Sequence, residues 1–153
     1  MKLDGPDRYY LVVPKGRFSI KKALGEHQLS HRATGRSPKL YVVHDHGRPI
    51  YVGITKQPIA ARLRLGWSAD GRHGYHGYAW RHALRAVGLD IWYQTLAGLG
   101  GRLDDIETVE AEVVYLLRRR YRQWPEFQTE IHFHNSTTAH RKIARQVVGV
   151  YAK

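Results

Sequence analysis

The stretch KLYVVHDHGRPIYVGI, residues 39–54, decides the fold of this chain because it predicts a β-hairpin. Two runs rich in β-branched and aromatic residues, LYVVH and PIYVGI, flank the turn-forming residues DHGR at 45–48, an arrangement typical of two antiparallel strands. Tyr41 and Tyr51 then lie on adjacent strands. Tyrosines in such a pair often simply pack against each other across the hairpin, so the pair alone does not indicate a function.

Helices and further strands are predicted on both sides of the hairpin. Pro58 opens a short helix that ends near Gly66, because proline fits the first turn of a helix and glycine commonly ends one. The other predicted elements, in chain order, are a strand at 9–13, a helix within 78–88, a strand at 90–97, a helix at 103–122, a strand at 129–133 and a helix at 138–148. This order predicts an α/β (α+β) fold in which a small, mainly antiparallel sheet is flanked by helices.

Length and composition predict one domain with short extensions. The chain has 153 residues, of which 42% are apolar, enough for one core with little left for a second. We expect a basic N-terminal strand and arm at residues 1–38, a core at 39–135 and a C-terminal helical extension at 136–153.

The charge of the chain is strongly positive. Its 25 lysines and arginines outnumber its 13 aspartates and glutamates, so the net charge is +12. Such an excess favours a polyanionic partner, because each phosphate neutralised by lysine or arginine releases a condensed counterion. A membrane is the less favoured polyanion, since no apolar run approaches the ~20 residues that span a bilayer.

Two further properties limit the location and the chemistry. The apolar stretch at 9–13 is too short for a signal-peptide core, so we expect a cytoplasmic protein. The chain has no cysteine, which excludes disulfides, thiolate metal sites and a cysteine nucleophile. Any metal must therefore be held by Asp, Glu, Asn or His.

Residues beyond the two tyrosines supply the groups that phosphodiester hydrolysis needs. Arg62 lies on the first predicted helix after the hairpin, and arginine offers a forked donor for two phosphate oxygens. His76 precedes the next predicted helix. Glu112 lies on the longest helix, with Tyr115 and Leu116 three and four residues after it. A carboxylate suits magnesium, which needs only one or two protein oxygens.

In this order the residues resemble the GIY-YIG endonucleases over about residues 39–135. The first motif, KLY at 39–41, keeps only the tyrosine of Gly-Ile-Tyr, whereas YVG at 51–53 is a common form of Tyr-Ile-Gly. Asn135 follows the last predicted strand, where the family often carries an asparagine, and this place implies a bracing role. The missing glycine and isoleucine of the first motif concern strand geometry more than chemistry.

The resemblance implies a metal-dependent DNA endonuclease that leaves 5′-phosphate and 3′-hydroxyl ends. The base or water-orienting group is then Tyr41, assisted by Tyr51 and His76. Arg62 contacts the scissile phosphate, and Glu112 binds Mg²⁺, for which Mn²⁺ can substitute.

The choice of glutamate rests on two patterns that disagree. On a helical wheel Glu110 falls inside the apolar face of the long helix, whereas Glu112 falls at its edge. A carboxylate inside a core face is costly unless it is paired or binds a metal, so helical geometry favours Glu110. The motif spacing favours Glu112, which we take as the metal ligand, with Glu110 as the alternative.

Other polar residues are candidates for nucleic-acid or metal binding. The residues predicted to contact nucleic acid are Lys56, Arg64, Arg118 and Arg119. Cations at the end of a helix also complement its dipole, which is the structural alternative for the last two. His44 with His46, and His132 with His134, form i, i+2 pairs that would share one face of a strand and suit zinc, but the sequence specifies no third ligand.

The biological setting of such a nuclease stays open. A restriction-type enzyme cuts both strands at a short site, whereas a structure- or single-strand-selective enzyme stacks aromatic side chains on unpaired bases. The chain has no obvious separate DNA-targeting unit, so specificity would come from the core and its arms or from a homodimer. The alternative functions are a catalytically inactive nucleic-acid-binding module on the same scaffold and a basic structural or ribosome-associated protein.

Overall fold

A five-stranded sheet forms the centre of the computed structural model, which describes residues 1–13, 18–22, 29–95 and 103–152. The strands are β1 (Lys2–Val12), β2 (Ser19–Lys22), β3 (Lys39–Asp45), β4 (Arg48–Thr55) and β5 (Ala86–Thr95). Their order across the sheet is β2-β1-β5-β3-β4, and all four pairings are antiparallel. The predicted α+β fold with an antiparallel central sheet is confirmed.

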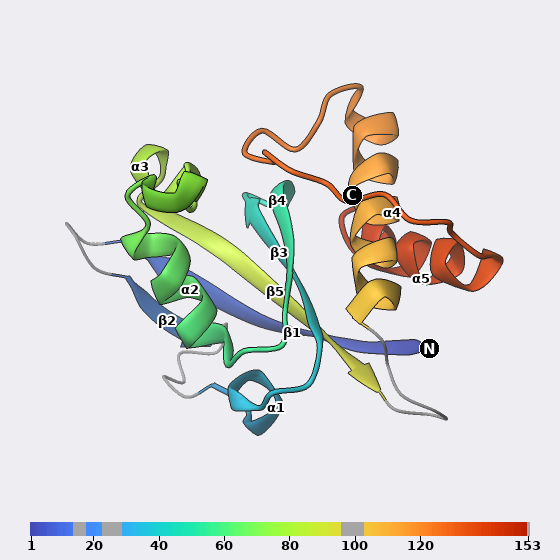
Figure 1. Cartoon of the computed structure of the whole chain (residues 1–153), viewed down its shortest axis with the longest axis horizontal. Coiled ribbons are helices and arrows are strands. Elements are labelled where there is room, and N and C mark those ends of the chain that lie inside the picture. Colours follow the sequence, from blue (N-terminus) through green and yellow to red (C-terminus); the bar gives the residue numbers. More distant parts are fainter. Residues whose placement is uncertain (14–17, 23–28, 96–102, 153) are drawn as a thin grey trace.

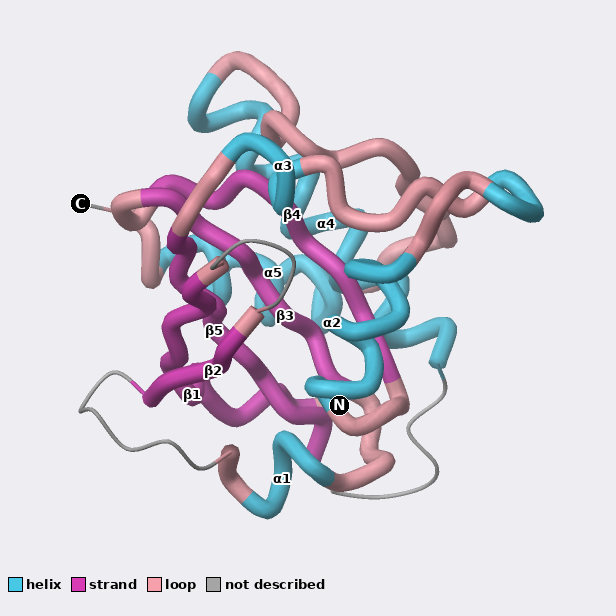
Figure 2. The backbone as a smooth tube through the Cα atoms, turned by 90° about the vertical axis from the view of Figure 1, so that its left-hand side faces the viewer, coloured by secondary structure: helices cyan, strands magenta, loops and turns pink. Residues whose placement is uncertain are grey.

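Helices cover both faces of the sheet (Figures 1 and 2). They are α1 (His31–Thr34), α2 (Ile59–Ser68), α3 (Trp80–Ala83), α4 (Leu103–Tyr121) and α5 (Thr138–Gly149), with a 3₁₀ turn at Arg72–Gly74. One core packs α2 and α3 against the sheet face that carries Tyr41 and Val43, and the second packs α4 and α5 against the opposite face, with Leu40 and Val42. Alternate residues of β3 thus enter different cores, because side chains alternate across a strand.

The predicted hairpin is formed by β3 and β4. Tyr41 pairs with Gly53 and Val42 with Val52 along the ladder. The two central turn residues, His46 and Gly47, have φ values of 47° and 81°, the left-handed conformation that two-residue hairpin turns require. The hairpin places Tyr41 and Tyr51 side by side on one face of the sheet, with ring centroids 6.1 Å apart.

The N-terminal segment belongs to the sheet. β1 pairs with β5 from Lys2 opposite Thr95 to Val12 opposite Ala86, and it also pairs with β2. The division that set residues 1–38 apart as an extension is therefore revised, because β1 lies inside the sheet between two other strands. Residues 14–17 and 23–28 of that segment, and 96–97 of the strand predicted at 90–97, lie outside the described residues.

Two predicted elements differ from the observed ones. The helix predicted within 78–88 is only the single turn α3, and β5 begins at Ala86. The strand predicted at 129–133 is wrong, because this segment forms no strand. Instead, the side chain of Gln128 attaches the chain to β4. The Gln128 amide accepts from the Val52 N–H at 2.9 Å and donates to the Val52 carbonyl at 3.1 Å. One glutamine therefore satisfies both backbone groups of Val52 at the outer edge of the sheet.

The helices at 103–122 and 138–148 are confirmed as α4 and α5, within one residue at each end. Within the described residues, no helix combines the length and the apolar character needed to cross a membrane. The cytoplasmic location stays a prediction.

Candidate active site

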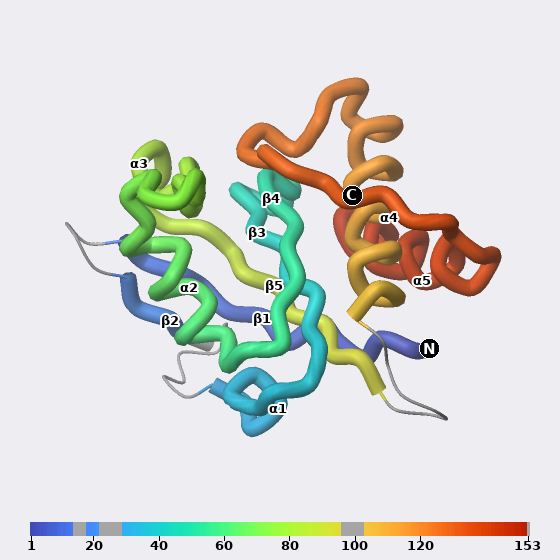
Figure 3. Tube along the Cα trace, viewed as in Figure 1, coloured from blue at the N-terminus to red at the C-terminus, as the bar shows by residue number. Residues whose placement is uncertain are grey.

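A cleft of about 590 Å³ opens beside β4, between the α2–α3 loop, the first half of α4 and the segment that follows α4. That segment runs from the end of α4 across to β4 and then back to α5 (Figure 3). The lining includes three of the five predicted catalytic residues, Tyr51, Arg62 and His76, together with Glu110. Four parts of the chain that are distant in sequence thus bring a phenol, a guanidinium, an imidazole and a carboxylate to one cavity.

Gly53 allows the two motif tyrosines to lie against the sheet. A Cβ atom at this position would lie 2.5 Å from the Tyr41 hydroxyl oxygen and 2.9 Å from the Tyr51 ring. Both distances are too short for a real contact, so only glycine fits here. The YVG sequence therefore has a packing reason, because its glycine lies beneath both rings.

Tyr41 lies below the cleft and not in its lining. Its side chain is fully buried, and its hydroxyl forms a 2.9 Å hydrogen bond with the hydroxyl of Tyr78. Burial and the neighbouring Tyr78 raise the pKa of Tyr41 well above its usual value, although the nearby Arg62 guanidinium lowers it in part. A protonated, buried phenol is a poor general base, so this geometry favours Tyr41 as a brace for its neighbours.

Tyr51 is the tyrosine that reaches the cleft. Its ring packs edge-on against Tyr78, with centroids 5.4 Å apart. Burial, and then the neighbouring Tyr41, also raise the pKa of Tyr51 above its usual value. Its hydroxyl therefore keeps its proton at neutral pH and is available as a hydrogen-bond donor.

Arg62 is held on α2 one position before the buried Leu63. Its guanidinium carbon lies 5.6 Å from the Tyr75 ring centroid and 5.9 Å from that of Tyr78. The buried Nε atom has no hydrogen-bond partner, and no carboxylate among the described residues forms an ion pair with this side chain. Aromatic rings thus orient a cation whose charge is not neutralised by an ion pair.

The loop that carries His76 is fixed by an arginine that the sequence did not single out. The Arg81 guanidinium donates hydrogen bonds of 2.9–3.1 Å to the carbonyl oxygens of four residues, Gly66, Ala69, His76 and Tyr78. His76 itself is exposed at the cleft. No local pattern identifies Arg81 in advance, because its partners are defined only once the loop has folded.

The structure separates Glu112 from the cleft. Glu112 lines a different cavity of about 220 Å³, together with Tyr115 and His134, whereas Glu110 lines the cleft with Glu107. Residues two apart on a helix point in nearly opposite directions, so Glu110 and Glu112 cannot share one site. The structure therefore places the alternative, Glu110, and not Glu112, in the cleft lining, as the apolar periodicity of the helix indicated.

Glu110 has an unusual electrostatic environment. Burial, followed by repulsion from Glu107 and Glu130, raises its pKa from 4.5 to about 8, and Arg62 offsets part of this rise. The carboxyl group makes no hydrogen bond or ion pair with the described residues. A carboxylate in this position becomes stable when a cation binds beside it.

The ligand set in the cleft suits magnesium better than zinc. No three histidine, aspartate or glutamate side chains of the described residues are grouped closely enough to enclose a metal ion. Zinc usually takes three or four protein ligands, whereas Mg²⁺ keeps most of its waters and binds one or two carboxylates. Glu110, unpaired and beside Glu107, fits the second pattern.

The remaining predicted site residues lie outside the cleft lining. All are exposed, and they are Lys56 after β4, Arg64 on α2, Arg118 and Arg119 near the end of α4, and Asn135 before α5. Arg118 lies over the Trp124 ring at 4.7 Å and Arg119 over Tyr115 at 5.9 Å.

The histidine pairs do not form zinc sites, because their members have different partners. His46 pairs with Asp45 at the hairpin turn, whereas His44 faces Asp90. His132 pairs with Glu130, and His134 with Glu107.

No family model, no curated protein and no solved structure matches this chain. Membership of the GIY-YIG endonucleases therefore stays a prediction from the motifs.

Proposed function

We propose that this chain is a metal-dependent endonuclease that hydrolyses DNA phosphodiesters in the cleft beside β4. The observation that carries the proposal is the convergence of Tyr51, Arg62, His76 and Glu110 on one cavity of about 590 Å³. The net charge of +12 supports a polyanionic substrate. The motif resemblance implies 5′-phosphate and 3′-hydroxyl products.

Arg62 is suited to the scissile phosphate. Its guanidinium has no carboxylate partner among the described residues, and its Nε atom lacks a hydrogen-bond partner. A fixed cation beside the phosphate stabilises the charge that develops in the transition state. Tyr78 and Tyr75 hold the guanidinium through their rings, and the buried Tyr41 holds Tyr78 through its hydroxyl.

Tyr51 and His76, which line the cleft, are suited to position the attacking water and accept its proton. The hydroxyl of Tyr51 is protonated and can orient the attacking water by a hydrogen bond. His76 is exposed in the lining, and an imidazole can accept the proton of that water at neutral pH. Tyr41 acts as a positioning residue in this scheme.

Glu110 is the residue that would hold Mg²⁺ or Mn²⁺. When bound, the ion supplies positive charge beside the phosphate and orients it. Glu110 must first lose its proton, and its pKa of about 8 makes that step dependent on pH.

A nucleic-acid-binding module without chemistry is the second candidate. The observation that favours it is the burial of Tyr41, whose hydroxyl is already engaged by Tyr78. Such a module would bind DNA with the same cleft and leave it uncut.

A cleavage assay separates these functions. Plasmid, linear duplex and single-stranded DNA are incubated with and without Mg²⁺, using the wild type, Glu110→Gln and Glu112→Gln. We expect Mg²⁺-dependent products from the wild type and from Glu112→Gln, and loss of at least about 100-fold in rate for Glu110→Gln. The preferred substrate distinguishes a restriction-type enzyme from a single-strand-selective one.

Two results would oppose the proposal in different ways. Loss of cleavage only in Glu112→Gln would return the metal site to the motif assignment. DNA binding without cleavage under any metal would leave the binding module as the function.

A further inference from the structure

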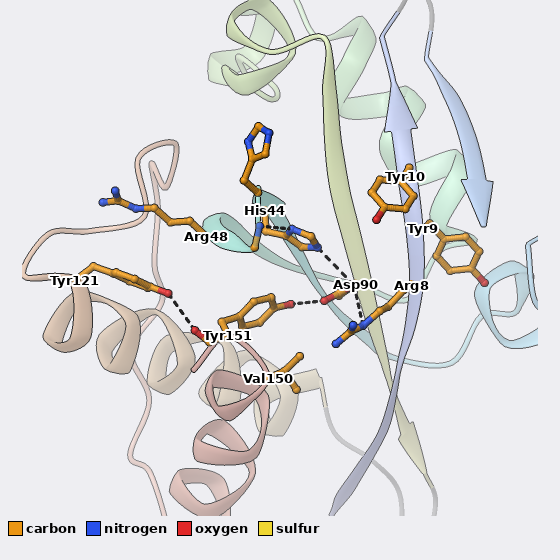
Figure 4. Close-up of a pocket in the computed structure, with 11 residues that line it drawn as sticks. Arg8, Tyr9, Tyr10, His44, Arg48, Asp90, Tyr121, Val150 and Tyr151 are labelled. Atoms are coloured by element: carbon orange, nitrogen blue, oxygen red, sulfur yellow. Dashed lines mark hydrogen bonds and ion pairs between the residues drawn. The ribbon is translucent and has the colours of Figure 1, made fainter. Parts of the chain in front are cut away.

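A second cavity, of about 460 Å³, lies at the turn of the β3–β4 hairpin, where β1, β5 and the ends of α4 and α5 meet (Figure 4). Among the described residues it shares no lining residue with the cleft. It is built around Asp90 of β5, whose side chain is only 3% exposed. The nuclease proposal gives no role to any residue of this cavity.

Asp90 has three partners that come from different parts of the chain. The Tyr151 hydroxyl donates to one carboxylate oxygen at 2.8 Å. The other oxygen lies 3.6 Å from Nε2 of His44 and 3.9 Å from Nε of Arg8, and it accepts no hydrogen bond. Figure 4 shows these three side chains directed toward Asp90 from three sides. The buried carboxylate thus anchors an arginine and a histidine in the lining.

The position of His44 is determined by two glycines. A Cβ atom at Gly88 would overlap the His44 ring, so the imidazole lies directly against β5. The Gly47 N–H donates to Nδ1 of the ring at 3.3 Å. Because Nδ1 accepts this bond, the neutral ring carries its proton on Nε2, the atom that faces Asp90. The lining is therefore pre-organised by backbone as well as by side chains.

Positive charge and aromatic surface dominate the rest of the cavity. Arg48 forms no ion pair with a carboxylate of the described residues, and its guanidinium lies 5.3 Å from the Tyr121 ring centroid. Arg8 is 59% exposed despite its contact with Asp90. Tyr10, which is 50% exposed, lies on the β1 side of the cavity, across from Arg48 and Tyr121. Two arginines outweigh one buried carboxylate in this lining, so an anion is the favoured ligand.

We infer that this cavity binds a nucleotide, with its phosphate on Arg8 and Arg48 and its base against the exposed ring of Tyr10. Guanidinium groups bind phosphate through paired N–H donors, and both arginines are exposed enough to turn toward a shared ligand. Any nucleobase can stack on an aromatic side chain, because every base has a π-face. The volume lies within the range of about 300–1,000 Å³ typical of small-molecule sites.

The nucleotide can be free or can be an unpaired residue of a DNA strand, since both present a phosphate beside a base. The inference does not depend on the proposed nuclease, because the two cavities have separate linings. Loss of one activity would leave the other measurable.

Isothermal titration calorimetry at constant ionic strength tests the inference with adenosine monophosphate, adenosine and inorganic phosphate. We expect the monophosphate to bind at least about tenfold more tightly than either fragment. Arg8→Gln and Arg48→Gln should each weaken it by about tenfold, and Tyr10→Leu should weaken it several-fold. Arg36→Gln is the matched control, because Arg36 is exposed before β3, at the end of the sheet remote from the hairpin turn.

Competition identifies the source of the nucleotide. A short single-stranded oligonucleotide that displaces the monophosphate, and that loses affinity in Arg48→Gln, supports a strand residue as the ligand. An oligonucleotide that does not compete supports a free nucleotide. Adenosine or phosphate binding as tightly as the monophosphate would overturn the inference. So would an absence of binding at millimolar concentration, or an equal loss of affinity in Arg36→Gln.

Discussion

The partly buried carboxyl group of Glu110 in the cleft beside β4 and the buried one of Asp90 in the second cavity have different surroundings. Asp90 has a tyrosine donor, with an arginine and a histidine side chain nearby. Glu110 has no hydrogen bond or ion pair with the described residues, and burial raises its pKa to about 8. A partnered carboxylate holds a structure together, whereas an unpartnered one is available for a ligand. The difference predicts a contribution of Asp90 to stability and is the basis on which we propose a ligand-binding role for Glu110.

Replacing each carboxyl group by an amide should reveal the largest difference between the two sites. Asp90→Asn replaces a charge-assisted acceptor of the Tyr151 hydroxyl by a neutral one, and it leaves Arg8 and His44 without their carboxylate. We expect it to lower the free energy of unfolding by about 2 to 3 kcal/mol. Glu110→Gln should not lower it at neutral pH, because no partner is lost.

Urea unfolding at neutral pH without metal measures both effects. Equal destabilisation by the two substitutions would show that Glu110 has a structural partner of its own.

Gly53 tests whether the cleft depends on the tyrosine packing. The Cβ atom of Gly53→Ala would meet the Tyr41 ring, which is fully buried and held by its hydrogen bond to Tyr78. We expect a loss of about 2 kcal/mol in the free energy of unfolding, together with displacement of Tyr51 from the cleft. Thermal melts and the cleavage assay measure the two consequences. An alanine that costs nothing would mean that Tyr41 is more mobile than its packing indicates.

The sequence predicts those parts of the fold whose signals are local. The hairpin, α4 and α5 were predicted because turn residues and helical periodicity lie within short windows of the chain. The full length of β1 was missed, since its pairing with β5 joins residues such as Lys2 and Thr95 that are far apart in sequence. The attachment of the segment before residue 129 was missed too, because a Gln128 side chain replaces a strand.

The two sites also differ in whether local sequence signals predict them. Tyr51, Arg62 and His76 were predicted for the cleft from ordered motifs, and the structure brings them together. The presence of Glu110 in the same cleft agrees with the alternative that the sequence offered, because its place on the apolar face of α4 is a local property. The Asp90 cavity was not foreseen, since Tyr151 and Asp90 are 61 residues apart and no motif links them.

The pH dependence of the free energy of unfolding tests the unusual environment that distinguishes Glu110 from Asp90. Its pKa is raised from 4.5 to about 8, so between these values the folded protein holds a proton that the unfolded chain has released. Stability therefore falls as pH rises through this window. Glu110→Gln removes that loss, and we expect it to be more stable than the wild type by on the order of 1 kcal/mol at about pH 9.

Urea unfolding at about pH 5 and pH 9 without metal measures this difference. Glu112→Gln on the same helix, which points away from the cleft, controls for general charge effects. A stability difference that does not change with pH would contradict the unusual environment of Glu110.

Gly88→Ala has the smallest expected effect on the free energy of unfolding. It tests whether the position of the His44 ring in the Asp90 cavity matters for binding apart from stability. The added methyl group of Gly88→Ala meets the His44 imidazole, a side chain that is partly exposed and able to rotate, in contrast to the enclosed ring above Gly53. The strain is therefore partly relieved, and alanine also gains from the lower entropy of its unfolded chain, so we expect a net loss below about 1 kcal/mol. The rotated imidazole no longer faces Asp90, and nucleotide affinity should fall several-fold while the melting temperature hardly changes. Unchanged affinity would show that His44 has no part in the site, and a loss of stability as large as that of Gly53→Ala would show that the cavity is packed as tightly as the tyrosine cluster.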